Sequence, residues 1–178
     1  MAVENIKSTP VTNLDSSPVV YNTQGEGAKF DLEHIDSFAT AAAAASINST
    51  YRFVRVPTTI KVKELIFESE AQGAGAIDIG VYYSSSTNDS PGALALAGVV
   101  VPGQQALFAS AVAITAAVTP TNVVNESGSY TLDKRSLPLW QVAGLAADPG
   151  GFFDIVGTLT TAVTTGTGRM GVRVGFAK

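Results

Sequence analysis

The stretch that decides the fold is Arg169-Met-Gly-Val-Arg-Val-Gly-Phe176. Large apolar residues alternate along it with arginine and glycine, so every second side chain falls on one side of an extended chain. This alternation is typical of a β-strand with one face on a hydrophobic core and the other face toward solvent. The sequence therefore predicts a half-buried antiparallel strand over residues 169–176.

The same pattern recurs along the chain upstream of this strand. Residues 77–83 and 153–159 alternate in the same way, and we expect half-buried antiparallel strands there too. Residues 51–56 form another candidate strand, which ends at Pro57. A further strand is expected around Phe108, Val112 and Ile114.

A change of parity marks one irregular strand. Residues 60 and 62 point to one side, whereas residues 65 and 67 point to the other. One extra residue in a strand produces such a change, so we expect a β-bulge near Lys63 or Glu64.

Glycine and proline punctuate the remaining chain. Pro138 and Gly144 bracket a short helix, and Asp148-Pro-Gly-Gly151 predicts a turn before a strand. Residues 36–50 fit a short alanine-rich helix or a strand equally well. Many short strands with such punctuation favour an all-β protein, an antiparallel β-sandwich of jelly-roll type with one or two short helices.

Charge divides the chain into two parts. Residues 1–40 hold six acidic and two basic residues, whereas residues 41–178 hold nine of each, so the net charge of -4 lies at the N-terminal end. No charged residue occurs between Asp89 and Glu126, as in a face that is covered in a larger assembly. We expect an extended N-terminal arm at 1–35 and a single β-sandwich domain at 36–178.

Composition excludes several kinds of chemistry. The chain has no cysteine and one histidine, which rules out thiolate sites and any two-histidine metal site within one chain. Only 15% of the residues are charged and no basic cluster is present, which argues against a nucleic-acid partner. The first residues lack an apolar core and no stretch is long enough to span a membrane, so we expect a protein that is made in a cytoplasm and not secreted.

Three motifs invite a chemical interpretation. Residues 166–171 match a dinucleotide-binding fingerprint, but the residues that follow alternate as a strand rather than a helix, so we expect a turn. Residues 31–36 form the densest polar cluster, which we expect to be solvated or to form salt bridges with a partner rather than to hold a metal. No nucleophile elbow accompanies His34, so we expect no catalytic residue, cofactor or small-molecule substrate. Tyr82, Tyr83 and Trp140 are candidates for stacking on sugars, but the adjacent tyrosines face opposite sides of a strand, so at most one of them would join a platform. Trp140 lies among apolar residues typical of a core.

Five stretches of the chain together carry a resemblance. They are Ile47-Asn-Ser-Thr-Tyr-Arg-Phe53, Ala71-Gln-Gly-Ala-Gly-Ala-Ile-Asp-Ile-Gly-Val-Tyr-Tyr83, Asn125-Glu-Ser-Gly-Ser-Tyr130, Pro138-Leu-Trp-Gln141 and Asp148-Pro-Gly-Gly-Phe-Phe-Asp154. In overall texture they resemble small structural proteins that tailed bacteriophages encode near the major capsid gene. Together they cover roughly residues 45–178, and the chain resembles a capsid decoration, or cement, protein. The resemblance implies a β-sandwich on the outside of a virion and no catalytic residues.

The sequence therefore predicts a non-enzymatic virion protein that clamps neighbouring capsomers from the capsid exterior. Its expected partners are the major capsid protein and copies of itself in a homo-oligomer, with many modest contacts multiplied by valency. A neck, tail or fibre-base component and a glycan-binding β-sandwich module remain as alternatives. The residues expected to contact the partner are Glu4, Lys7, Asp15, Tyr21, Glu26, Asp31, Glu33 and His34.

Overall fold

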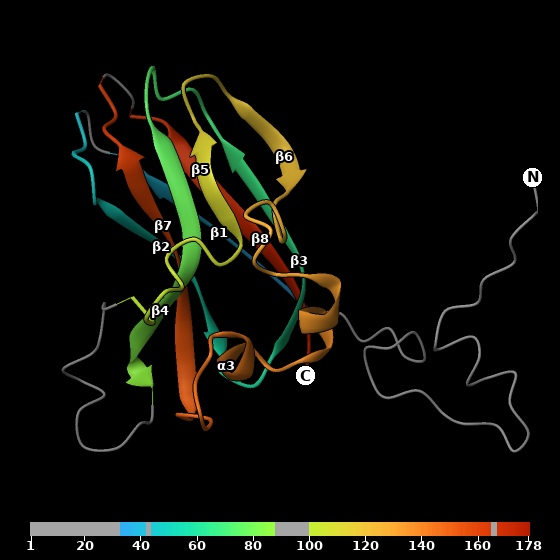
Figure 1. The fold of residues 1–178 in the computed structure, drawn as a ribbon. Helices are drawn as coiled ribbons and strands as arrows, with labels where there is room; N and C mark the ends of the chain where they lie inside the picture. Colours follow the sequence, from blue (N-terminus) through green and yellow to red (C-terminus); the bar gives the residue numbers. More distant parts are fainter. Residues whose placement is uncertain (1–32, 42–43, 88–99, 165–166) are drawn as a thin grey trace, which may run out of the picture.

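The computed structural model describes residues 33–41, 44–87, 100–164 and 167–178, with side chains omitted at 85–87. Eight strands account for most of these residues (Figure 1). They are β1 (Glu33–Thr40), β2 (Thr50–Pro57), β3 (Lys61–Ser69), β4 (Ala76–Thr87), β5 (Ala109–Ala113), β6 (Val118–Asn122), β7 (Gly151–Thr161) and β8 (Arg169–Ala177). A 3-10 helix, η1 (Leu132–Ser136), and a single helical turn, α3 (Leu139–Val142), lie between β6 and β7.

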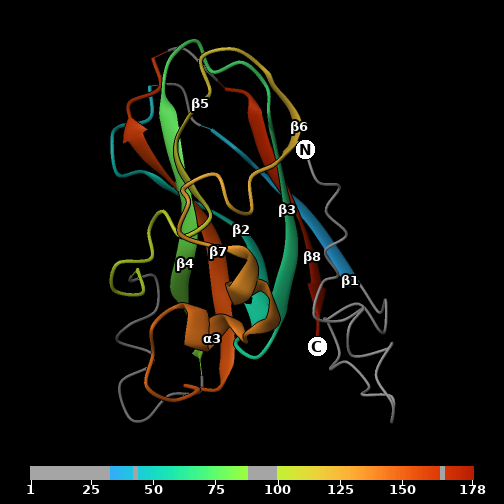
Figure 2. The same cartoon turned by 45° about the vertical axis from the view of Figure 1, so that its right-hand side comes forward.

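The strands form two four-stranded antiparallel sheets packed face to face, with the orders β1-β8-β3-β6 and β2-β7-β4-β5 (Figure 2). The predicted all-β sandwich is therefore confirmed. The pairs β1 with β8, β2 with β7, β3 with β6 and β4 with β5 are those of one long hairpin folded over on itself. This connectivity carries the chain from one sheet to the other at almost every turn, so residues distant in sequence fill one core.

That core lies between the sheets. Side chains such as Phe67, Ile79, Ile155 and Val174 point inward and are fully buried. The rings of Phe53 on β2 and Phe67 on β3 meet edge to face across the two layers, with centroids 6.4 Å apart. Burial of this apolar surface is the main favourable contribution to folding.

The predicted bulge is present in β3. The pairing of β3 with β8 shifts register between Val62 and Glu64, which leaves Lys63 as the extra residue. Lys63 turns toward η1 and its Nζ donates to the carbonyl oxygen of Arg135 at 2.6 Å. The bulge allows Val62 and Leu65 both to face the core and so resolves the change of parity seen in the sequence.

The prediction of half-buried strands at 77–83 and 153–159 is wrong, because both faces of these strands are buried. They are the central strands β4 and β7, and their outward side chains are covered as well as their inward ones. The strand at 169–176 matches the prediction, since Arg169 and Arg173 on its outward side are exposed.

Residues 36–40 are strand rather than helix, as part of β1, and 44–49 form a turn. The strand begins at Glu33, so the first three residues of the sheet fall within the stretch 1–35 that we assigned to the arm. Pairing with β8 decides in favour of strand for residues 36–40, and the strand ends at Thr40, before the alanine run.

The short helix after Pro138 and the turn at 148–151 are confirmed. α3 follows Pro138, Gly144 just after it has a left-handed φ of 77°, and Asp148 Oδ1 accepts a hydrogen bond from the Gly150 backbone N–H in the turn before β7. The strand around residue 108 is β5, which is shorter than expected and leaves Phe108 and Ile114 as buried flanks. Within the described ranges, neither helix is long and apolar enough to cross a membrane.

Candidate contact surface

The structure places two of the eight predicted contact residues, both at the start of β1. Glu33 Oε1 lies 2.7 Å from Lys178 Nζ, in an ion pair whose side chains are both exposed. His34 stands opposite Gly175 of β8, next to the outer face of the sheet. The other six lie outside the described residues: Glu4, Lys7, Asp15, Tyr21, Glu26 and Asp31.

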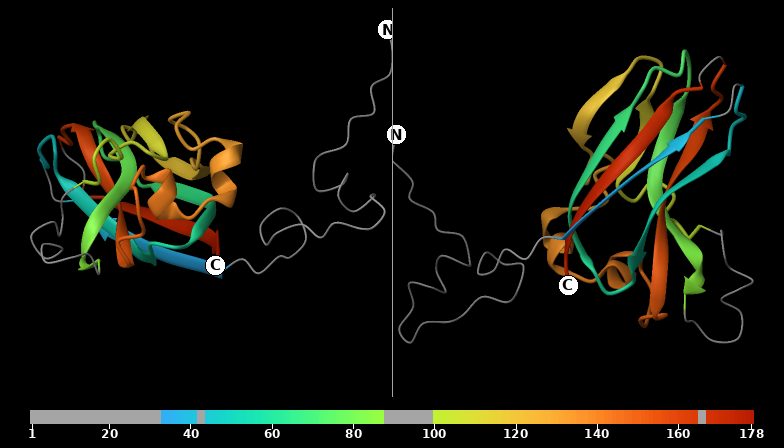
Figure 3. Two further views of the ribbon diagram at one scale, coloured as in Figure 1. Left: turned by 60° about the horizontal axis from the view of Figure 1, so that its bottom comes forward. Right: turned by 180° about the vertical axis from the view of Figure 1, so that it is seen from behind.

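His34 belongs to the outer face of the β1-β8-β3-β6 sheet, which we call the open face. β1 and β8 lie toward the viewer in the right-hand view of Figure 3. Alternation and register assign its side chains, because cross-strand partners share a face. β1 contributes His34, Asp36, Phe38 and Thr40; β8 contributes Arg169, Gly171, Arg173, Gly175 and Ala177; β3 contributes Lys61, Glu64, Ile66 and Glu68.

Phe38 is the main apolar group of the open face, with 64% of its surface exposed. Two open hollows of about 350 and 360 Å³ flank it, and both are lined by Phe38 and Glu68. Pro120, Ala117 and Val118 of the β5–β6 region form the opposite wall. The hollows therefore make a shallow trough between the two edge strands of the sheet, with β8 and β3 as its floor.

Glycine keeps the trough open. Gly171 pairs with Phe38 on one side and Glu68 on the other. A Cβ atom at this position would lie 3.4 Å from the Phe38 Cβ and 3.1 Å from the Ser37 carbonyl oxygen. A side chain here would occupy the space between Phe38 and Glu68, so glycine at residue 171 leaves the floor of the trough clear.

Charged pairs bridge the strands of the open face. Arg173 Nε lies 2.8 Å from Asp36 Oδ1, and this hydrogen bond and charge raise the pKa of Arg173, with smaller contributions from Glu68 and Glu64. Arg169 Nη2 lies 3.2 Å from Glu70 Oε1, and its guanidinium also stands 5.8 Å from the centre of the Phe38 ring. The Arg169 backbone N–H is the main cause of a lowered pKa at Glu70.

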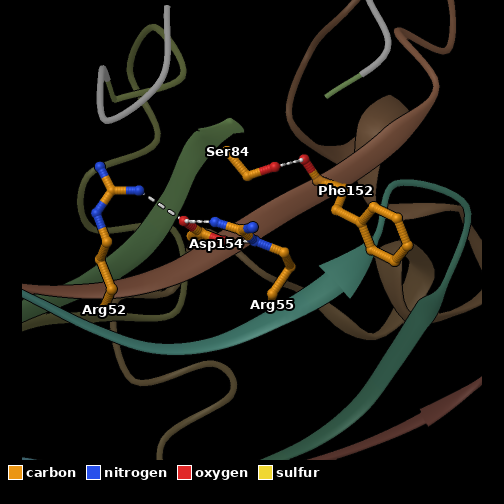
Figure 4. A network of polar contacts seen from close by, with 5 residues as sticks. All are labelled: Arg52, Arg55, Ser84, Phe152 and Asp154. Atoms are coloured by element: carbon orange, nitrogen blue, oxygen red, sulfur yellow. Dashed lines mark hydrogen bonds and ion pairs between the residues drawn. The ribbon is translucent and has the colours of Figure 1, made fainter. Parts of the chain in front are cut away.

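The opposite sheet has a different outer face, which we call the closed face. A bulge at Phe53 brings Arg52 and Arg55 to the same side of β2, where both form ion pairs with Asp154 of β7 (Figure 4). Arg52 Nη1 lies 2.6 Å from Asp154 Oδ2, and Arg55 Nε lies 2.7 Å from Oδ1. The Asp154 side chain is 4% exposed, so the two guanidiniums cover it. The hydrogen bond to Asp154 is the main cause of a raised pKa at Arg55.

The chain also covers β4 on the closed face. Residues 101–108 pass beside this strand, and the Val81 and Gln104 backbones hydrogen-bond there. A Cβ atom at Gly80 would overlap the carbonyl oxygens of Gln104 and Gln105. Asp78 accepts from Gln105 Nε2 and from the Ala111 backbone N–H, so its carboxylate is held by the same segment. Part of the stretch without charged residues between Asp89 and Glu126 therefore packs against β4 of its own domain.

Tyr82, Tyr83 and Trp140, the rings of the alternative sugar-binding site, do not form an exposed platform. Tyr82 and Tyr83 are 5% and 9% exposed, and the Tyr82 hydroxyl lies 2.6 Å from Thr158 Oγ1. Trp140 is partly buried and packs against the core. Tyr82 and Tyr83 are buried because both sides of β4 are covered. Alternation along a single strand does not show what covers its outer side.

A metal site would need several ligating side chains of the described residues to lie close together. No group of three His, Asp or Glu side chains gathers closely enough among them to hold a metal ion. What the open face can do is make contacts: it combines an exposed ring, hollows on both sides of it and ion pairs near the surface. Phe38 was missed in the sequence because residues 36–50 were not assigned to a strand.

Comparison with known proteins gives a structural likeness. No family model matches the chain, and no curated protein matches it either. A chain of the solved cyanophage Pam1 capsid asymmetric unit is similar in structure, with a TM-score of 0.49 and 12% sequence identity. The match covers 91% of this chain and 95% of that chain.

Proposed function

We propose that the chain is a non-enzymatic virion structural protein of a tailed phage, which decorates the outside of the capsid and stabilises it by clamping neighbouring capsomers. Its partners are then the major capsid protein and further copies of itself. The residue resemblance over 45–178 supports this assignment, and the open face supplies a surface through which it acts.

The observation that carries the proposal is the contrast between the two outer faces. On the closed face Asp78 and Asp154 are buried against groups of the same domain, whereas on the open face Phe38 is 64% exposed beside the trough. Contiguous apolar surface rimmed by polar groups marks interaction sites, and Phe38, Ile66 and Pro120 gather around one hollow of the open face. The face also lies next to the point where the arm joins the sheet, at Glu33.

The strand order supports the same assignment at the level of fold. We infer that the folded-over hairpin is a jelly roll, an architecture found in viral capsid proteins, lectins and cupins. Fold alone does not choose among these. The single histidine disfavours a histidine-rich metal site of an enzyme, and the buried tyrosines disfavour the predicted lectin platform.

The arm completes the proposed clamp. Acids of residues 1–35 (Glu4, Asp15, Glu26, Asp31 and Glu33) meet lysines or arginines in a groove of a neighbouring shell subunit, while the β-sandwich rests on the lattice. Each contact is modest, and two attachments on one chain raise the effective concentration of the second.

The test compares full-length protein with a variant that lacks residues 1–32, a deletion that ends just before β1. Shells of the phage assembled without this protein are mixed with each form and sedimented. We expect the truncated form to give an unchanged circular dichroism spectrum but to bind about tenfold or more weakly. Binding as tight as that of the full chain contradicts the clamp.

Copy number separates decoration from the alternative of a neck, tail or fibre-base component. Quantitative protein gels of purified virions give the ratio of this chain to the major capsid protein. A ratio that follows the number of capsomers supports decoration, whereas a ratio fixed by one ring at a single vertex assigns the chain to the neck or tail.

A further inference from the structure

The open face carries two carboxylates without a salt bridge. Asp36 pairs with Arg173 and Glu70 pairs with Arg169, but Glu64 and Glu68 have no ion pair among the described residues. With Asp36, Glu64, Glu68 and Glu70 set against Arg169, Arg173 and Lys61, the described part of this face has a net charge of -1. A partner that binds here gains most by bringing positive charge.

The spacing of these carboxylates defines a shape. Glu64, Ile66 and Glu68 lie in one row on β3, because alternate residues of a strand share a face. The row is about 13 Å long, since a strand advances about 3.3 Å per residue. An extended segment of a partner has the same repeat, so two of its side chains four residues apart would reach Glu64 and Glu68 together.

The hollow beside this row accepts an apolar group. Phe38, Ile66 and Pro120 line the first hollow, and Gly171 leaves the floor next to it without a side chain. A side chain midway between the two cationic positions would lie over Ile66 and cover part of the exposed Phe38 ring. Burying apolar surface there removes it from water and favours binding.

Charge also decides against another copy of this chain as the occupant. Residues 1–32 contain four acidic and two basic residues, so the arm of a neighbouring copy has a net charge of -2, the same sign as the open face. The open face of a second copy has that sign too. Like charges brought together at an interface oppose association.

We propose that the open face is the docking site for an extended basic segment of a different protein, in which two cationic side chains four residues apart bind Glu64 and Glu68 and an apolar side chain between them covers Phe38. The inference deepens the proposed function, because it states the chemistry of the partner. It rests on that function only for the partner's identity as a shell protein.

The test uses synthetic peptides and the full-length protein labelled with ¹⁵N. The probe is a capped heptapeptide with the core Lys-Ser-Leu-Ser-Lys, and its two controls carry Glu in place of both Lys residues or Ser in place of Leu. We expect the probe to shift amide signals of β1, β3 and β8. The Glu peptide should give no shifts, and the Ser peptide should bind about threefold more weakly.

Matched variants assign the binding to the open face. The double substitution Glu64→Gln and Glu68→Gln should weaken binding of the probe about tenfold, and Phe38→Ser about fivefold. The control for charge is Glu126→Gln with Asp133→Asn, which removes two carboxylates elsewhere. The control for exposed apolar surface is Leu132→Ser, at a residue that is 76% exposed. Both controls should bind as the unmodified protein does.

Several outcomes would overturn the inference. Equal loss of binding in the charge control would show general attraction to an acidic protein. Self-association of the protein that Phe38→Ser abolishes would assign the face to a second copy. Binding to a glycan array that Phe38→Ser abolishes, with no response to the peptides, would assign it to sugars. Because the peptide assay contains no shells, a failure here and a failure of shell binding are distinguishable.

Discussion

The two outer faces of this sandwich are each built from four strands and differ in how far the chain itself covers them. On the closed face, the segment 101–108 lies against β4, and two arginines of β2 enclose Asp154. On the open face, Phe38 is 64% exposed and the carboxylates near it are solvated. Both sheets have a glycine on an outward position of a central strand, Gly80 and Gly171, with different surroundings.

This difference indicates which face the chain covers with its own segments and which face is available to bind another molecule. A sheet face that is covered by its own loop gains stability from that cover and offers little to a partner. A face with an exposed ring and no cover of its own contributes little to folding and remains available for binding. Substitutions should therefore affect stability on the closed face and binding on the open face.

The largest expected effect comes from the pair of outward glycines. Gly80→Ala places a methyl group against the carbonyl oxygens of Gln104 and Gln105, which belong to the backbone and can move only with the whole segment. We expect a loss of about 3 kcal/mol in the free energy of unfolding by urea. Gly171→Ala meets looser contacts and should cost less than about 1 kcal/mol. Equal costs would contradict the contrast between the faces.

The next effect compares two ion pairs. Asp154→Asn removes the charge that lies between Arg52 and Arg55 on a nearly buried side chain, and we expect it to cost about 2 kcal/mol in urea unfolding. Glu70→Gln breaks the exposed pair with Arg169 on the open face. It should leave the unfolding midpoint unchanged, because water screens exposed pairs. A larger loss for Glu70→Gln than for Asp154→Asn would reverse our assignment of the two faces.

A smaller effect appears at high pH. Tyr130 is fully buried and donates to the Val62 carbonyl oxygen at the bulge of β3, and burial raises its pKa above the ordinary value of 10.0. In the unfolded chain this hydroxyl ionises near pH 10 while in the folded protein it stays neutral. Its contribution is therefore complete below pH 10 and falls by about 1.4 kcal/mol for each pH unit above it.

Urea unfolding between pH 9 and 11 measures this slope, with Tyr130→Phe as the comparison. The variant should be less stable at neutral pH by about 1 kcal/mol, since it lacks the hydrogen bond to Val62. It should also lose stability less steeply above pH 10. The same slope in both proteins would show that Tyr130 ionises as freely in the folded state as in the unfolded one.

Alternation along the sequence predicts much of the fold because the core depends on which side chains share a face. Met170, Val172 and Val174 give one strand directly, and the parity change around Lys63 gives the bulge. What local patterns cannot show is what covers the other side of a strand. Val156 on the outward side of β7 is fully buried for this reason, and Tyr82 is buried rather than displayed.

The candidate site is less predictable than the fold. Glu33 and His34 fall at its edge, but Phe38 and Glu68 come from strands separated by β8, and register alone brings them together over Gly171. No local pattern encodes that meeting. The strand signal at 33–40 is weak because, of the inward residues Ile35, Ser37 and Ala39, only Ile35 is large and apolar.

The central claim is that the open face is the surface on which the partner binds. The chain has no cysteine, so single cysteines introduced at Thr40 on the open face and at Ala147 before β7 can be labelled selectively with a maleimide. When shells bind nine-tenths of the protein, we expect labelling of Thr40→Cys to slow about tenfold while labelling of Ala147→Cys is unchanged. Equal labelling of Thr40→Cys in free and shell-bound protein would contradict the account.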